Sequence, residues 1–352
     1  MPVWQDEGDG PLSDRSAFLS VYDEQAWFVW GGRDSLGTPL RDGAVYEEAT
    51  GTWFTLPEPS TIEPRSNAAG VWTGEFLLVW GGQGAGMDTL GDGARYARQD
   101  GTWSAMAVQG APSPRADAAA IWDRDGTMTV WGGRTGSGAA LVNGARYSVS
   151  SDSWTPMSDS VLSPRLGASV VWDPMRSRMV VWGGRVGGSV RRDGAIYDAA
   201  SDSWSGMADA PIARAGHVAF WDAPRDRMVV LFGRDGFWTG ERGDGAAWNP
   251  VTGTWTMISD VSISGYTVAD GFAVSMSGGH VWVTGGDATG YGVPTSRGAR
   301  YDLANDAWSA LPDLARARSG HGSAFVGNLV VWGGRPSASG WTPSTERLRF
   351  LP

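Results

Sequence analysis

The sequence predicts an all-β fold, a seven-bladed β-propeller of four-stranded blades, and three observations lead to this prediction. A motif of an apolar residue, a tryptophan and two glycines, first met at Val29–Gly32, occurs in seven versions along the 352 residues. Its period is about 50 residues, which is in the range of propeller blades. Each period also contains four short strand patterns separated by turn residues. The 52 glycines and 21 tryptophans therefore indicate a turn-rich, tightly packed β chain.

The seven versions of the motif define seven units. They begin at Val29, Val79, Val130, Val181, Leu231, Val283 and Val331. Because each blade packs only on its neighbours, a single closed domain can span residues 1–352 despite this length. We expect six blades at about 13–57, 63–107, 113–158, 163–208, 212–258 and 266–312, and a seventh formed by 316–352 together with 1–6.

The second unit shows how one blade is expected to be built. Strand a is predicted from Arg65 to Trp72, and strand b from Phe76 to Trp80 after a tight turn. A loop then leads to strand c at 93–96, and a turn at 99–101 leads to strand d. In most units an aromatic residue ends strand c and a tryptophan begins strand d, as in Tyr46/Trp53, Tyr147/Trp154, Tyr197/Trp204, Trp248/Trp255 and Tyr301/Trp308. We expect these rings to pack one blade against the next.

The two ends of the chain are complementary. The last unit stops after a strand c pattern at Glu346–Phe350 and has no strand d of its own. At the other end, a strand d pattern at Val3–Gln5 opens the chain without a blade to belong to. We therefore expect the N-terminal strand to pair beside Phe350 and complete the last blade, which would leave no open sheet edge.

These residues closely resemble the kelch repeat, which has a glycine pair after strand b, an aromatic residue closing strand c, a tryptophan opening strand d and an arginine before strand a. Two units depart from the pattern, with Phe232 in place of one glycine and Thr284 in place of the tryptophan. The resemblance implies a propeller of the kelch and galactose-oxidase-central-domain superfamily. That family includes protein-interaction modules, sugar-acid epimerases, specifier proteins and a copper oxidase domain, so function has to be argued from the site.

Composition excludes several kinds of chemistry. All 28 basic residues are arginine and the chain has no cysteine, which rules out Schiff-base lysines, thiol nucleophiles and disulfides. The net charge of −10 argues against nucleic acid and anionic membranes as main partners. The three histidines cannot form one metal site, because His280 belongs to the turn between strands a and b at the opposite end of its blade. We expect neither a metal nor another cofactor.

The first ten residues lack a basic segment and an apolar core, and no apolar run is long enough to span a membrane. We expect a soluble monomer, either cytoplasmic or secreted after removal of a signal.

Two positions in the loop between strands b and c carry complementary side chains. They are the residue after the glycine pair and the residue before strand c, which give Arg33/Asp42, Gln83/Asp92, Arg134/Asn143, Arg185/Asp193, Arg234/Asp244, Asp287/Arg297 and Arg335/Glu346. The sixth pair is reversed in sign. We therefore expect the two members of each pair to bond directly to one another, in a structural role.

A second set of arginines is expected at the start of strand a. The set consists of Arg15, Arg65, Arg115, Arg165, Arg214 and Arg318. Because strand a is the innermost strand, these arginines should surround one mouth of the central channel. There they would either tie down the loops of their own blades or bind a carboxylate, sulfate, phosphate or acidic peptide loop.

The sixth unit has no arginine at this position, since Ala269 occupies it and Asp270 follows. His217 and His321 each lie three residues after an arginine of the set. Together with Asp270 they are candidates for catalytic proton transfer, with ordinary packing along strand a as the alternative.

Aromatic residues in the loops are concentrated in the last three units. Phe237, Trp238, Tyr291 and Trp341 lie in loops between strands b and c, and Tyr266 lies in a loop before strand a. Aromatic side chains beside arginines would suit a protein-binding hot spot or a sugar-binding cleft.

The sequence thus favours a binding module that holds an anionic or polar partner, either an unidentified protein or peptide segment or a glycan, at the arginine-lined mouth. One alternative is a cofactor-free enzyme that resembles the kelch sugar-acid epimerases and mutarotases, in which Arg214 and Arg318 grip a carboxylate. The other alternative is a purely structural disc.

Overall fold

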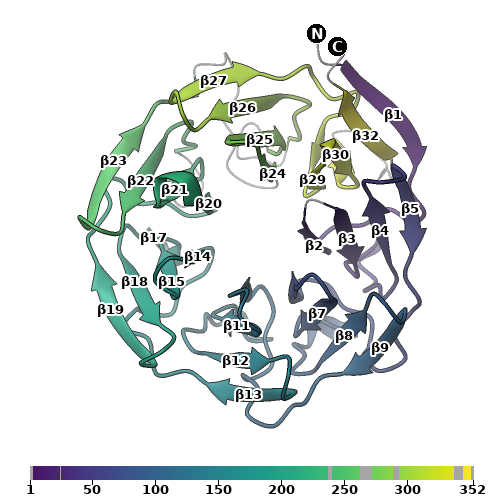
Figure 1. The fold of residues 1–352 in the computed structure, drawn as a ribbon, viewed down its shortest axis with the longest axis horizontal. Coiled ribbons are helices and arrows are strands. Elements are labelled where there is room, and N and C mark those ends of the chain that lie inside the picture. Colours follow the sequence, from purple (N-terminus) through teal and green to yellow (C-terminus); the bar gives the residue numbers. More distant parts are fainter. Residues whose placement is uncertain are drawn as a thin grey trace. The chain divides into compact units, whose positions relative to one another are not determined.

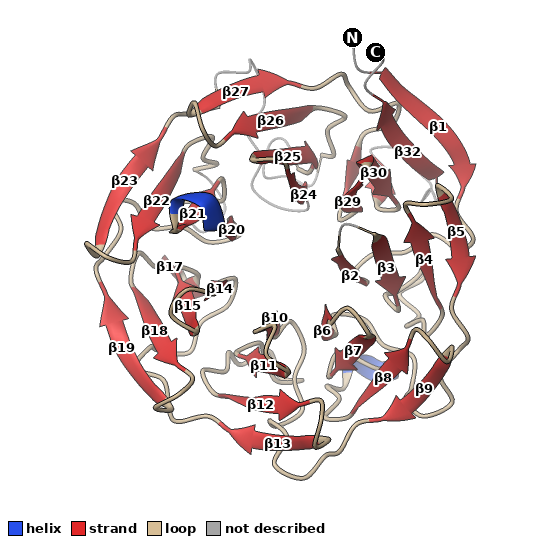
Figure 2. Cartoon of the chain, in the orientation of Figure 1, coloured by secondary structure: helices blue, strands red, loops and turns tan. Residues whose placement is uncertain are grey.

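The chain folds into seven four-stranded antiparallel sheets, the blades of a β-propeller (Figure 2). The structure is a computed structural model that describes residues 3–23, 25–236, 240–261, 272–287, 293–336 and 344–349. The only helical elements in these ranges are the 3₁₀ turns η1 (Ala85–Met87) and η2 (Ala223–Arg225). The predicted all-β, seven-bladed fold class is therefore confirmed.

Two compact units make up the chain. The three-blade unit consists of Met1–Glu58, Pro64–Ser66 and Ser259–Pro352, and the four-blade unit of Pro59–Glu63 and Asn67–Ile258. We number the blades by the order of their first strands, so that blades 1, 6 and 7 belong to the three-blade unit and blades 2 to 5 to the four-blade unit.

In the four-blade unit each blade follows the order a, b, c, d along the chain (Figure 1). Blade 2 contains β6 (Ala69–Trp72), β7 (Phe76–Trp80), β8 (Gly93–Ala97) and β9 (Thr102–Ala105), and blade 3 contains β10 (Ala119–Trp122), β11 (Thr127–Trp131), β12 (Gly144–Ser148) and β13 (Ser153–Pro156). Blade 4 contains β14 (Ser169–Asp173), β15 (Arg178–Trp182), β18 (Gly194–Asp198) and β19 (Ser203–Met207), and blade 5 contains β20 (Val218–Asp222), β21 (Arg227–Leu231), β22 (Gly245–Asn249) and β23 (Thr254–Ile258). A small hairpin of β16 (Arg185–Val186) and β17 (Ser189–Val190) extends blade 4.

In the three-blade unit, blade 1 contains β2 (Leu19–Tyr22), β3 (Ala26–Trp30), β4 (Gly43–Glu47) and β5 (Thr52–Thr55), and blade 6 contains β24 (Phe272–Ser277), β25 (His280–Gly285), β26 (Gly298–Asp302) and β27 (Ala307–Ala310). Blade 7 contains β29 (Gly322–Val326), β30 (Asn328–Trp332), β32 (Ser344–Arg349) and β1 (Val3–Asp9). The short strands β28 (Arg318–Ser319) and β31 (Arg335–Pro336) pair beside blade 7.

The N-terminal strand completes blade 7, as the sequence predicts. Strand β1 runs antiparallel to β32, with Val3 opposite Arg349 and Trp4 opposite Leu348 (Figure 1). The indole of Trp4 also donates a hydrogen bond of 2.8 Å to the carbonyl of Pro312. The first residues of the chain therefore supply both the missing strand d and its tryptophan.

The repeated aromatic residues join neighbouring blades, as the sequence predicts. In blade 3, Tyr147 and Trp154 pack with ring centroids 5.1 Å apart, and Nε1 of Trp154 donates to the carbonyl of Ala107, which follows blade 2. The hydroxyl of Tyr147 donates to Asp152, whose carboxylate also accepts from the amide of Ala107. The same indole bond to the preceding segment is made by Trp204, Trp255 and Trp308. Each ring is thus explained by the packing of blades.

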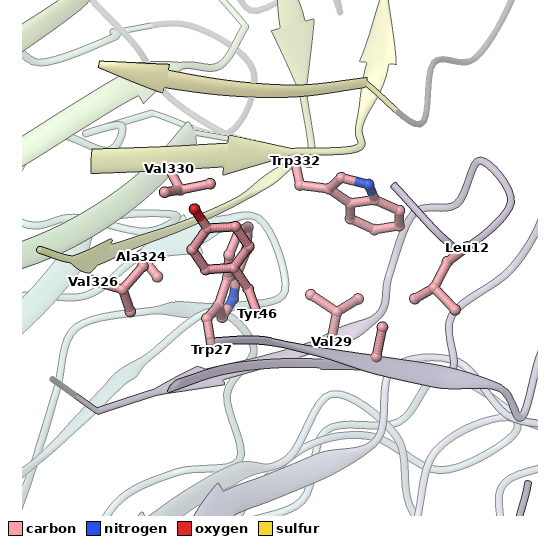
Figure 3. Packing of buried hydrophobic residues seen from close by; sticks show 9 residues of the cluster. Leu12, Trp27, Val29, Tyr46, Ala324, Val326, Val330 and Trp332 are labelled. Atoms are coloured by element: carbon pink, nitrogen blue, oxygen red, sulfur yellow. The ribbon is translucent and has the colours of Figure 1, made fainter. Parts of the chain in front are cut away.

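The apolar core lies between the sheets, as the contact between blades 1 and 7 shows (Figure 3). Trp27 and Val29 of β3 face Val330 and Trp332 of β30, and all four side chains are fully or almost fully buried. Burial of these faces stabilises the fold by about 25 cal/mol per Å² of apolar surface removed from water. Burial of this kind between neighbouring blades adds to the stability of each blade in such a repeat protein.

Candidate functional site

The predicted strand-a arginines lie four residues before strand a, so the expected start of this strand is wrong. Arg165, for example, precedes β14, which begins at Ser169. The reason is a residue in the left-handed region that breaks the extended backbone two positions after each arginine. These residues are Ala17, Asn67, Asp117, Gly167, Gly216 and Gly320, with φ between 54° and 66°.

All six of these arginines are buried. The exposed fractions of Arg15, Arg65, Arg115, Arg165, Arg214 and Arg318 are 2% or less. In blade 4, Arg165 donates two hydrogen bonds to the carboxylate of Asp193, at 3.0 and 2.8 Å, and others to the carbonyls of Gly183 and Ser163. The bond to Arg165 holds the pKa of Asp193 below its usual value.

The same arrangement recurs in four further blades. The pairs are Arg15 with Asp42, Arg115 with Asn143, Arg214 with Asp244, and Arg318 with Glu346. These guanidinium groups tie the loop between strands b and c to the segment before strand a, which is the structural alternative that the sequence analysis named. Any part that the six arginines play in binding a partner stays a prediction.

In blades 1, 3, 4, 5 and 7 the structure gives the residue before strand c a different partner from the one expected. In these five blades its partner is the arginine before strand a, whereas the pairs Gln83/Asp92 and Asp287/Arg297 stay predictions. Asp42 bonds to Arg15, whereas Arg33 donates to the hydroxyl of Ser66. In the sixth unit, Asp287 lies 3.6 Å from Arg335 of blade 7.

The arginines after the glycine pair make other contacts. In blade 3, Arg134 donates from Nε to Asp117 and from Nη2 to Gln83. Its side chain is 22% exposed, in contrast to the fully buried Arg115 of the same blade. Arg185 holds the equivalent position in blade 4 and is also partly exposed. Sequence reasoning assigned these residues to structure and so missed them as candidate site residues.

Both candidate histidines are buried packing residues. Nε2 of His217 shares a hydrogen bond of 2.8 Å with the hydroxyl of Ser169, and Nε2 of His321 shares one of 3.0 Å with the hydroxyl of Thr284. Burial, reinforced by the neighbouring arginine, lowers the pKa of each imidazole to about 3. Both rings are therefore uncharged near neutral pH.

Each histidine ring fills a slot against the preceding blade. The ring of His217 packs edge-on against Trp182 of blade 4, with centroids 4.9 Å apart. Phe18 fills the same slot in blade 1 and contacts Trp332 of blade 7 at 5.5 Å. In blades 2, 3 and 4 the residue three positions after the arginine is an alanine, at Ala68, Ala118 and Ala168.

A cavity of about 490 Å³ lies where Ala168 leaves this slot unfilled, between blades 3 and 4. Its walls include Ala118 and Trp131 from blade 3 and Leu166 and Ala168 from blade 4. Its polar lining comes from Asp117, Arg134, Arg165 and Arg185. A second hollow of about 260 Å³ shares Leu166 and Arg185 with the first and reaches Gly138 and Ala140 of the b–c loop of blade 3. Apolar side chains combined with a few convergent polar groups are typical of ligand sites.

The remaining sequence predictions for the site lie outside the described residues. These are Tyr266, Asp270, Phe237, Trp238, Tyr291 and Trp341. Within the described ranges, no group of three or more acidic, histidine or cysteine side chains is arranged to hold a metal ion. The described part of the chain also contains no helix long and apolar enough to cross a membrane.

Comparison with known proteins agrees with the repeat pattern and the blades. A family model described as the KLHDC2/KLHL20/DRC7 Kelch-repeats domain matches residues 67–286. No curated protein matches the chain. The family model covers more than half of the sequence, and its span contains five of the seven versions of the glycine motif. The chain belongs to the kelch-repeat family.

Proposed function

We propose that this protein is a protein-binding module that recognises an acidic segment of its partner at the cavity between blades 3 and 4. The observation that carries the proposal is this cavity of about 490 Å³, whose polar lining includes two partly exposed arginines, Arg134 and Arg185. Kelch propellers commonly bind other proteins, and a cavity of this size is in the range that ligands occupy. The site lies wholly within the four-blade unit.

The charge of the site favours an anionic ligand group. Arg134 uses Nε and Nη2 for bonds to Asp117 and Gln83, which fixes the plane of the guanidinium and leaves Nη1 to donate to a ligand. Arg165, although it also lines the cavity, is held by Asp193 and serves as a fixed positive wall. A carboxylate suits such a preorganised guanidinium, because hydrogen bonds between charged groups are stronger than those between neutral groups.

The shape of the site favours an extended chain over a compact ligand. The hollow of about 260 Å³ continues from the cavity through Leu166 and Arg185. A peptide segment could place one side chain in the cavity and its neighbours along this extension. For this reason we propose a protein segment rather than the glycan that the sequence analysis left open.

A random peptide library displayed on phage tests the proposal. We expect the purified protein to enrich peptides rich in Asp and Glu. We also expect the double variant Arg134→Ala/Arg185→Ala to bind the enriched peptides at least about tenfold more weakly, which is about 1.4 kcal/mol. Binding is measured by isothermal titration calorimetry, with circular dichroism to show that the variant is folded.

The matched control is Arg41→Ala, which removes an arginine paired with Glu58 on the surface of the three-blade unit. It removes one positive charge without touching the cavity and should leave the affinity unchanged. Enriched peptides without an acidic bias, or an equal loss of affinity in the Arg41→Ala variant, would show that the proposal is wrong.

A further inference from the structure

The junction between blades 3 and 4 lacks a backbone bond that its neighbours in the four-blade unit form. The amide of Gly82 donates to the carbonyl of Arg115, and the amide of Gly184 donates to that of Arg214, each at 2.8 Å. Among the described residues of this unit, the corresponding bond from Gly133 to Arg165 is not formed. Gly133 instead lines the cavity. The amides of Gly82 and Gly184 donate across their blade junctions, whereas the amide of Gly133 is a hydrogen-bond donor at the wall of the cavity.

The ring that closes the next junction is also missing here. At the junction of blades 4 and 5, a Cβ added to Gly183 would lie 2.7 Å from Cε1 of His217, so the imidazole rests directly on this glycine. At the junction of blades 3 and 4, a Cβ added to Gly132 would meet only the carbonyl oxygen of Leu141, at 3.7 Å. This junction therefore has a vacancy in the slot, because Ala168 stands where His217 stands one blade later and the bond from Gly133 to Arg165 is not formed.

The walls of the vacancy indicate which kind of ring it suits. His217 bonds to the hydroxyl of Ser169, which lies opposite Trp182 in blade 4. The residue opposite Trp131 in blade 3 is Ala119, which offers no such hydroxyl. Ala118, Ala119, Trp131, Ala168 and Val170 all line the cavity, so an imidazole would lose its hydrogen-bond partner there, whereas a phenyl ring would not. Phe18, which fills this slot in blade 1, shows that a phenyl ring fits the repeat.

We propose that the cavity takes a phenyl-type aromatic side chain of the partner, with an adjacent carboxylate bound by Nη1 of Arg134 and the amide of Gly133. This inference rests on the proposed function and names its ligand class, an acidic segment that contains an aromatic residue. A cavity of about 150 Å³ already admits benzene, so the volume here holds one ring together with part of the backbone that carries it. The aromatic ring supplies buried apolar area and the carboxylate supplies orientation.

Two synthetic peptides test the inference on the unmodified protein. They are acetyl-Asp-Glu-Phe-Glu-Asp-amide and the same peptide with Ala in place of Phe, titrated by calorimetry at equal ionic strength. We expect the Phe peptide to bind at least about tenfold more tightly than the Ala peptide, because only the Phe peptide fills the vacancy. The free acid 3-phenylpropionate serves as a third probe and should bind more weakly than the Phe peptide.

The variant Ala168→Phe fills the slot from within, as Phe18 does in blade 1. We expect it to remove the preference for the Phe peptide while the Ala peptide binds as before. Ala168→Ser, which keeps the side chain small, should retain the preference. If Ala168→Phe fails to fold, the smaller Ala168→Leu replaces it, and the comparison of the two peptides on the wild-type protein stands without any variant.

The outcomes separate this inference from the proposed function. If both peptides bind equally to the wild-type protein and Arg134→Ala/Arg185→Ala weakens both, the acidic-segment function stands and the aromatic inference is wrong. If neither peptide binds, both are wrong. If 3-phenylpropionate binds as tightly as the Phe peptide, the ligand is a free aromatic acid and the assignment to a protein segment is wrong.

Discussion

The pair of Arg165 and Asp193 shows how a residue acquires a structural role that its position in the sequence does not reveal. The guanidinium is fully buried, and a buried charge is tolerated only when it is paired and hydrogen-bonded. Asp193 accepts with both carboxylate oxygens, and the other acceptors include the carbonyls of Gly183 and Ser163 and the hydroxyl of Ser163. In blade 3 a neutral residue accepts from the buried arginine, since Arg115 donates to the amide oxygen of Asn143 at 2.9 Å.

Replacing Asp193 therefore has a graded effect. We expect Asp193→Asn to lower the free energy of unfolding by less than about 1 kcal/mol, because an amide oxygen can still accept from Arg165 as Asn143 does from Arg115. Asp193→Ala leaves buried donors without their acceptor and should cost about 2–3 kcal/mol, a figure moderated by the partial exposure of the carboxylate. Urea unfolding followed by tryptophan fluorescence measures both values.

A surface pair provides the control for this series. Arg192 and Asp209 are 59% and 52% exposed, so Asp209→Ala should cost less than about 0.5 kcal/mol. Equal costs for Asp193→Ala and Asp209→Ala would contradict the structural role of the buried arginines.

The sequence could predict that charges are complementary in each repeat, but not which residues meet. Counting along the chain places Arg33 and Asp42 at the base of one loop, yet the carboxylate turns toward Arg15, which lies 27 residues before it. Two residues after this arginine the backbone turns at Ala17, which lies in the left-handed region. A left-handed alanine has no strong signal in a single sequence, so the bond from Arg15 to Asp42 could not be predicted from it.

At the scale of the strand, the residue three positions after the arginine contributes to how one blade packs on the one before it. A ring closes the junction where the residue is Phe18, His217 or His321, and an alanine leaves it open at Ala168. The sequence shows which units have an aromatic or imidazole ring at this position and which have an alanine. It does not show the cavity, because the existence of the cavity also depends on the missing bond between Gly133 and Arg165 and on the distance between two sheets.

The buried histidines make stability depend on pH. The pKa of His217 and of His321 is about 3 in the folded protein, against about 6.5 in an unfolded chain. Between these values the unfolded state binds protons that the folded state does not, so unfolding is favoured progressively as the pH falls below about 6.5. We expect the melting temperature of the wild-type protein to drop between pH 7 and pH 4.

The double variant His217→Phe/His321→Phe isolates this contribution. Phe18 shows that a phenyl ring suits the slot, so the variant should fold, with some loss of stability at pH 7 because Ser169 and Thr284 lose their bonds to the imidazoles. Its melting temperature should then fall less steeply with acid than that of the wild-type protein, measured by differential scanning calorimetry. Carboxylates contribute equally to both curves, so parallel curves would contradict the assigned histidine pKa values.

At the scale of the whole molecule, the repeat is strong enough for the sequence to predict the number of blades, the order of their strands and the completion of blade 7. With seven versions of one motif, a single irregular residue, such as Phe232 in place of a glycine, does not change the prediction. The candidate site was harder to predict for the same reason. A binding site is a place where one unit differs from the others. A single small residue such as Ala168 leaves a large space between two blades, yet it barely changes the sequence pattern.

Strand β1 gives the most direct test of this architecture. Deletion of residues 1–9 removes the partner of β32 and the bond from Trp4 to Pro312, and it exposes the backbone groups of an edge strand. We expect the shortened protein to melt at a lower temperature and to self-associate in analytical ultracentrifugation. A synthetic peptide of residues 1–10 should restore both properties by adding the strand back. The same peptide with Ala in place of Trp4 should restore them less well, because the indole no longer reaches the segment after blade 6. Unchanged melting of the shortened protein would mean that blade 7 does not depend on its fourth strand.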